Sequence, residues 1–151
     1  MIIVAWIVLA LVIAFTSILL ITIGANAWWH MPYVPTPVSV AGKMADMAGC
    51  KTGDVVYDLG CGDGRVLMEA KRKYPGIKAI GYEIALGVWM LAKWRQFWKR
   101  SDVTIKLESF MKKNLADADV IFLYLSPSFM TTLLKKFATD LRPGTRIVSH
   151  S

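Results

Sequence analysis

The chain has 151 residues, which suits one compact domain plus an additional segment. Its net charge of +7 is modest and no nucleic-acid recognition motif accompanies it, so nucleic acid is not an expected partner. The hydrophobic content of 55% is high for a soluble protein, and the excess is concentrated at the N-terminus.

Residues 2–24 contain no charged side chain. At about 1.5 Å per residue, a helix of this length spans roughly 35 Å, enough to cross the hydrocarbon core of a bilayer with some tilt. Trp28, Trp29 and Tyr33 follow at once, where the aromatic belt of a membrane protein would lie. We therefore expect residues 1–27 to be a transmembrane anchor.

A cleaved signal peptide is the alternative, because Ala25-Asn26-Ala27 resembles a cleavage site. However, no basic segment precedes the apolar run, and the run exceeds the about 7–15 residues of a signal-peptide core. Every Lys and Arg lies after the span, beginning with Lys43. The positive-inside rule then predicts a single-pass membrane protein whose domain faces the cytoplasm and whose N-terminus lies outside.

Residues 28–37 contain three prolines and are expected to form a linker before a domain at 38–151. The remaining pattern alternates helical and extended segments. Helices are predicted at 38–48, 65–74, 86–100 and 129–141, and strands at 55–59, 77–84, 103–108, 118–125 and 146–150. This order predicts an α/β fold, a Rossmann-like doubly wound parallel sheet of about five strands.

A glycine-rich loop, residues 58–64, joins the first predicted strand to the helix that follows. Its glycines allow a sharp turn and let a ligand approach backbone amides, while the helix start offers further N–H groups. The candidate ligand-binding residues of this loop are Asp58, Gly60, Cys61, Gly62, Asp63 and Gly64.

The spacing discriminates between cofactors. A dinucleotide site would have a third glycine where this chain has Arg65, and Asp63 would face a pyrophosphate badly. A carboxylate there suits a ligand that carries an ammonium or sulfonium group. Glu83, at the end of the second strand, can accept hydrogen bonds from both hydroxyls of a ribose. S-adenosylmethionine (S-adenosyl-L-methionine) has all these features and no phosphate, so it is the predicted cofactor.

Other strand ends should meet this loop, because ligands of such sheets bind at the carboxyl ends of the strands. Ser109 and Phe110 could contact an adenine, the hydroxyl at its edge and the ring at its face, although a polar turn is an equal role for Ser109. Tyr124 is the candidate catalytic residue, as a pocket wall or an orienting hydroxyl. Its alternative is an aromatic side chain of the core.

The helix at 86–100 mixes tryptophans with basic residues. It could pack on the sheet with Lys93, Arg95, Lys99 and Arg100 in water. Alternatively, its basic and aromatic face could touch anionic lipid beside the anchor.

Histidines and cysteines give no metal-ligand spacing. Cys50 and Cys61 are expected to be reduced thiols in the cytoplasm, with Cys61 contributing only its backbone to the loop. His30 and His150 are far apart in sequence and have the usual solvated or structural roles.

Four segments together resemble class I S-adenosylmethionine-dependent methyltransferases, namely residues 32–37, 53–65, 81–83 and 141–150. More narrowly, Pro-Tyr-Val-Pro-Thr-Pro and Pro-Gly-Thr-Arg-Ile-Val-Ser-His are similar to protein N-lysine methyltransferases of archaea. They are also similar to membrane-anchored relatives that modify the ADP/ATP carrier and the ATP synthase c subunit. The resemblance covers residues 32–151.

By this resemblance, Glu83 would bind the ribose and residues 60–64 the methionine part, while Tyr33, Pro35 and Thr36 would fold over the cofactor as a flap. Ser109 stands where the family has an acidic or amide residue. Leu125-Ser126-Pro127-Ser128 stands where many amino-methylating enzymes have Asn-Pro-Pro-Tyr. The family also continues past its Ser-His with an antiparallel strand pair. We expect that pair to be lacking here, and three explanations stay open: a partner covers the sheet edge, the edge is left open, or the natural sequence is shortened.

The predicted function is therefore a membrane-anchored methyltransferase acting on lysine side chains of a protein, itself membrane-associated, with the lipid bilayer as a second partner. Transfer is expected to depend on alignment and on a neutral, desolvated lysine rather than on a catalytic triad. A methyltransferase for a lipophilic small molecule and a non-catalytic cofactor-binding membrane module are the alternatives. A nicotinamide-dependent oxidoreductase is disfavoured by Asp63 and Arg65.

Overall fold

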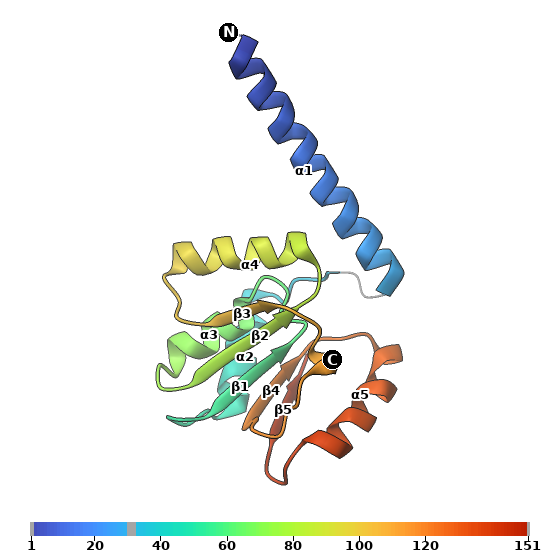
Figure 1. Cartoon of the computed structure of the whole chain (residues 1–151). Helices are drawn as coiled ribbons and strands as arrows, with labels where there is room; N and C mark the ends of the chain where they lie inside the picture. Colours follow the sequence, from blue (N-terminus) through green and yellow to red (C-terminus); the bar gives the residue numbers. More distant parts are fainter. Residues whose placement is uncertain (1, 30–32, 151) are drawn as a thin grey trace.

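A computed structural model describes residues 2–29 and 33–150 (Figure 1). A long helix leads into an α/β domain with one five-stranded sheet. The elements are α1 (Ile2–Trp29), α2 (Val38–Ala48), β1 (Val55–Leu59), α3 (Arg65–Lys73), β2 (Lys78–Glu83), α4 (Leu86–Lys99), β3 (Thr104–Leu107), the 3₁₀ helix η1 (Phe110–Lys112), β4 (Val120–Leu123), α5 (Pro127–Asp140) and β5 (Arg146–Ser149).

The sheet has the order β3-β2-β1-β4-β5, and all of its pairings are parallel. The chain winds outward from β1 to β3, then returns to the other side of β1 with β4. Asp58 on β1 lies opposite Gly81 of β2 and Phe122 of β4, so it stands at the point where the winding reverses. The predicted doubly wound sheet is thus confirmed, and this reversal is where such folds hold their ligands.

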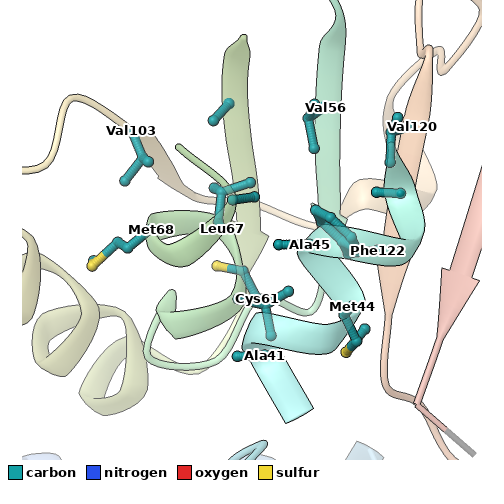
Figure 2. Close-up of a cluster of buried hydrophobic side chains, with 14 of the residues drawn as sticks. Ala41, Met44, Ala45, Val56, Cys61, Leu67, Met68, Val103, Val120 and Phe122 are labelled. Atoms are coloured by element: carbon teal, nitrogen blue, oxygen red, sulfur yellow. The ribbon is translucent and has the colours of Figure 1, made fainter. Parts of the chain in front are cut away.

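Successive residues of the central strands face opposite sides of the sheet and form two cores. On one side, α2 and α3 cover Val56, Val120 and Phe122 (Figure 2). On the other side, α5 covers Tyr57 and Ile121. Since both faces are covered, the strands read as continuous apolar runs, which is typical of parallel sheets.

Replacing Phe122 by alanine is expected to lower the free energy of unfolding by about 3–5 kcal/mol. The side chain has no exposed surface and lies at the centre of the cluster in Figure 2, where the sheet meets α2. Phe97→Ala is the matched control, because that ring is 76% exposed and should hardly change stability. Chemical unfolding in detergent measures both, and equal effects would contradict the packing described.

The predicted elements are all present, with small differences at their ends. Helix α1 continues through Trp29, two residues beyond the expected anchor. Helix α5 begins at Pro127 rather than Phe129, because proline suits the first helical position. β4 is shorter than predicted, and Asp119 instead accepts a hydrogen bond from the Val55 amide through its side chain (2.8 Å).

Helix α1 is apolar all round and lies outside the domain. Residues Ile2–Ile21 are long and apolar enough to cross a membrane, and none of that stretch is buried. Part of α1 lies against α4. The side chains of Trp28 and Trp29 fall outside the described structure, so their place in the predicted aromatic belt stays a prediction. Tyr33, the third residue of that belt, instead packs its ring against Gly62. Pro32 also lies outside the described residues.

Candidate functional site

A cavity of about 360 Å³ opens at the carboxyl ends of the strands. Its size lies within the about 300–1,000 Å³ that is usual for small-molecule sites. The sequence-predicted residues that line it are Tyr33, Pro35, Thr36, Asp58, Gly60, Cys61, Gly62, Asp63, Glu83, Ser109, Phe110 and Tyr124. Segments far apart in the chain therefore converge on one space, as the topology predicts. Gly64 is the exception and does not line the cavity.

The glycine-rich loop depends on backbone angles that side chains disfavour. Gly60, Gly62 and Gly64 have φ of 76°, 57° and 73°. A Cβ on Gly62 would lie 2.9 Å from the Tyr33 ring, and one on Gly64 would lie 2.9 Å from the Ile105 side chain. Gly62 therefore brings the flap onto the loop, while Gly64 serves the packing of the loop against β3.

The amides of this loop are used within the protein. Gly60 and Cys61 donate to the Tyr82 carbonyl, and Gly64 donates to that of Cys61. Gly62 donates to Glu83. The expectation that a ligand would lie against bare amides is therefore wrong for these four positions. Their hydrogen bonds fix the loop in shape instead.

Glu83 is buried at the end of β2 and organises the backbone around it. One carboxylate oxygen accepts from the amides of Ile84 and Ala85 (2.8 Å each), and the other accepts from Gly62 (3.1 Å). Burial raises the pKa of this carboxyl, while the backbone hydrogen bonds oppose that rise. A carboxylate has about four acceptor positions, so one remains on the oxygen that faces Gly62.

Asp58 is the strongest electrostatic feature of the cavity. It is buried, and its Oδ2 has no hydrogen-bond partner within the described residues. Burial, with the nearby charges of Glu83 and Asp63, raises the pKa of Asp58 to about 8. A cation bound beside Asp58 would lower this pKa again, since an opposite charge favours the ionised carboxylate.

Asp63 is held between two arginines. Its carboxylate contacts Arg65 (2.6 Å) and Arg95 of α4 (2.8 Å). Burial alone would raise the pKa of Asp63, but these guanidinium groups bring it below its usual value. The expectation that Arg95 lies in water is therefore wrong. The negative charge that was to attract an ammonium group is already compensated within the protein.

The same ion pair secures the flap. Arg65 donates to the Thr36 carbonyl (2.7 Å), and Thr36 is buried. Tyr33 lies beside Asp63, and its pKa is raised to about 12 by burial and by the carboxylate's charge and hydrogen bond. Asp63 thus joins the flap, the glycine-rich loop and α4 at one point.

Asp63→Asn is expected to lower the free energy of unfolding by about 2–3 kcal/mol, because it leaves Arg65 and Arg95 without their shared carboxylate. Amide hydrogen exchange in residues 33–37 should quicken. Asp102→Asn is the control, since that ion-paired carboxylate is 83% exposed and should tolerate the change. Unaltered exchange in the flap would show that Asp63 does not secure it.

The far end of the cavity is aromatic and apolar. Phe110 is buried and meets Phe129 edge to face, with ring centroids 6.0 Å apart. Ser109 precedes η1 and lines the cavity beside it. Tyr124 is half-buried in the wall, not in the core, and its ring centroid lies 4.4 Å from that of His150. Sequence reasoning gave His150 no part here, because the pairing of β4 with β5 cannot be read from spacing.

Cysteines and histidines form no metal site within the described residues. Cys50 and Cys61 are free thiols and both are buried. The Cys61 sulfur packs towards Gly81, where an added Cβ would lie 2.7 Å from it. The amide and carbonyl of Cys61 are hydrogen-bonded to Tyr82 and Gly64. His30 lies outside the described residues.

Residues 58–151 match the family model of the ANTKMT methyltransferase domain, which is more than half of the chain. The chain belongs to this family. It is a class I S-adenosylmethionine-dependent methyltransferase, and the glycine-rich loop and Glu83 lie within the matched region.

Relatives of this methyltransferase include curated lysine-modifying enzymes. It is 36% identical over 123 residues to the protein-lysine N-methyltransferase of Saccharolobus islandicus, covering 80% of this chain and 76% of the relative. It is 30% identical over 124 residues to the adenine nucleotide translocase lysine N-methyltransferase of Mus musculus, with 80% and 52% covered. The chain thus spans only about half of the mouse protein.

A solved structure agrees with the fold and the cofactor. An RNA methyltransferase from Salinibacter ruber, in complex with S-adenosyl-L-homocysteine, has 33% sequence identity and a TM-score of 0.73, covering 78% of both chains. S-adenosylhomocysteine is what S-adenosylmethionine becomes after giving up its methyl group. S-adenosylmethionine is therefore the cofactor of this methyltransferase.

Proposed function

We propose that this methyltransferase is membrane-anchored and transfers methyl groups from S-adenosylmethionine to lysine side chains of a protein. One observation carries the proposal: a chain 36% identical to a protein-lysine N-methyltransferase has the cofactor cavity and an apolar N-terminal helix together. The proposed division is an anchor at 1–27, a linker and flap at 28–37, and a catalytic domain at 38–151.

The cavity offers a position for each part of the cofactor. Glu83 would accept from one ribose hydroxyl at its remaining acceptor position, and a second hydroxyl would have to replace the Gly62 amide. The ionised Asp58 would balance the positive methionine end. Phe110 and Ser109 would border the adenine, and Tyr33, Pro35 and Thr36 would cover the cofactor. Asp63 would act indirectly, by holding the loop and the flap.

The acceptor would enter at the end of β4, beside Tyr124 and Leu125. Bound S-adenosylmethionine supplies a methyl group on a sulfonium. Transfer breaks the S–CH₃ bond, forms an N–CH₃ bond and leaves a proton on the amine to be lost to solvent. The attacking lysine must be neutral, and a wall made of Leu125 and Phe129 favours the neutral form by excluding water. Tyr124 would orient the amine as a positioning hydroxyl at this wall.

The anchor supports an acceptor confined to the same membrane. Helix α1 would span the bilayer with the domain on the cytoplasmic side, since basic residues occur only after the span. Tethering raises the effective concentration of a membrane-associated substrate without any new contact. Protease protection of tagged termini in sealed membrane vesicles tests this orientation. An N-terminal tag on the cytoplasmic side would contradict it.

RNA is the second candidate acceptor, favoured by the relative from Salinibacter ruber. The test supplies the full chain and tritiated S-adenosylmethionine to a cell extract, then separates protein, RNA and lipid. Radioactivity recovered as methyllysine after protein hydrolysis is the expected result. Label in nucleosides would identify RNA as the acceptor in place of lysine, and label in the lipid fraction alone would identify a lipophilic small molecule.

A further inference from the structure

Helix α4 is apolar on the side that faces away from the domain. Its exposed apolar residues recur three, four, seven or eight positions apart and so share one helix face. This outer face consists of Leu86, Met90, Leu91, Trp94, Phe97 and Trp98. The three large aromatics are 61%, 76% and 67% exposed, in chain order. Exposed apolar surface concentrated on one helix face marks an interaction site.

The opposite side of α4 is firmly attached to the domain, so its orientation is well determined. Val88 and Ala92 are buried against the core. The Trp89 indole donates to the Ile105 carbonyl of β3 (3.2 Å), and Arg95 reaches Asp63. A rotation that buried the outer face would break all of these contacts. The apolar outer face is therefore a property of the folded domain.

Basic residues border this face. Lys93 and Arg100 are exposed beside Phe97 and Trp98, and α4 contains no acidic residue. Tryptophan beside lysine and arginine is the composition of helices that lie in the membrane interface. The rings reach the boundary of headgroups and acyl chains, while the cations meet anionic lipid.

The outer face also adjoins the candidate membrane span. In Figure 1, α4 (yellow-green) lies along the side of the domain from which α1 (blue) projects, and the two helices are in contact. The aromatic residues of α4 keep their exposure with α1 in place. A bilayer crossed by α1 would therefore meet α4 without rearrangement of the domain.

We propose that the outer face of α4 docks on the anionic surface of the bilayer that α1 anchors. The methyltransferase then has two membrane contacts, and the second fixes how the domain is turned. Because Arg95 of the same helix holds Asp63 of the glycine-rich loop, docking sets the cavity at a defined angle to the membrane. The inference rests on the membrane anchor of the proposed function but does not depend on which acceptor is methylated.

The test places a nitroxide label on the outer face of the full-length protein. Phe97→Cys is labelled and the protein is reconstituted in phosphatidylcholine vesicles with or without phosphatidylglycerol. Leu134→Cys is the matched control, because this exposed apolar residue lies on α5, which covers the other face of the sheet. The native cysteines are buried, and unsubstituted protein gives their background. Collision with oxygen or with a water-soluble nickel complex reports whether each label lies in lipid or in water.

With phosphatidylglycerol present, the ratio of oxygen to nickel accessibility should be several-fold higher at position 97 than at 134. Replacing Lys93 and Arg100 by glutamine should reduce this difference. Equal ratios at 97 and 134 in anionic vesicles would overturn the proposal. So would spin–spin broadening at 97, because it would identify a second copy of the chain as the occupant. If Phe97→Cys does not fold, Trp98→Cys gives the same reading from the same face.

Discussion

Glu83→Ala is expected to weaken binding of S-adenosylmethionine by about 10- to 100-fold, because a hydrogen bond to a charged group contributes about 1.5–3 kcal/mol. The substitution removes the acceptor for the ribose. It also leaves the amides of Gly62, Ile84 and Ala85 without their partner, so the loop loses its shape as well. Calorimetric titration of the detergent-solubilised protein measures the change.

Glu108→Gln is the matched control for this substitution. Glu108 follows the neighbouring strand β3 but is exposed and paired with Lys113, and it does not line the cavity. Its replacement should leave cofactor affinity unchanged. If Glu83→Ala folds and binds S-adenosylmethionine as tightly as the unsubstituted protein, the cofactor does not lie at the end of β2.

Cofactor binding is expected to strengthen as pH rises from about 5.5 to 7.5, by up to about tenfold per pH unit. In the free protein Asp58 holds a proton, since its pKa is raised to about 8. The positive methionine end favours the ionised carboxylate, so binding must release that proton, and the release becomes easier as pH rises. The window stays below about 8, where an α-amino group loses its own charge.

Titrations in buffers of different ionisation enthalpy measure the proton release, and Asp58→Asn should abolish it together with the pH dependence. Stability gives an independent check. A raised carboxyl pKa means that the folded chain binds more protons than the unfolded chain between about pH 4 and 8, so stability should fall as pH rises through this window. If the cofactor affinity of the unsubstituted protein did not change with pH, Asp58 would not lie beside the methionine end of the cofactor.

The fold could be predicted from local sequence because each signal was local. The apolar runs around Val56 and Val120, the glycines of the loop and the turn prolines Pro75 and Pro143 act over a few residues. The convergence of Glu83, Ser109 and Tyr124 on one cavity followed from a general property of parallel sheets. That expectation holds only if the sheet is doubly wound. The observed strand order, β3-β2-β1-β4-β5, is that of a doubly wound sheet.

Contacts between distant elements could not be predicted. Arg95 lies 32 positions after Asp63, and only the packing of α4 on the sheet brings them together. In sequence, Arg95 has the same appearance as the exposed Lys93. The Tyr124–His150 contact and the use of the loop amides within the protein depend likewise on the completed sheet. In sequence, the outer face of α4 resembles the apolar stripe by which a helix packs into a core. Only the structure shows that the other side of the helix is the buried one.

The most direct test of a membrane-tethered lysine methyltransferase is the distribution of transferred methyl groups. The full chain in native membranes is given tritiated S-adenosylmethionine, with Glu83→Ala as the blank, and membrane and soluble proteins are then analysed separately. We expect methyllysine in membrane proteins, and none above the blank in the soluble fraction. Methyllysine mainly in soluble proteins, or label with no methyllysine in either fraction, would contradict the proposed function.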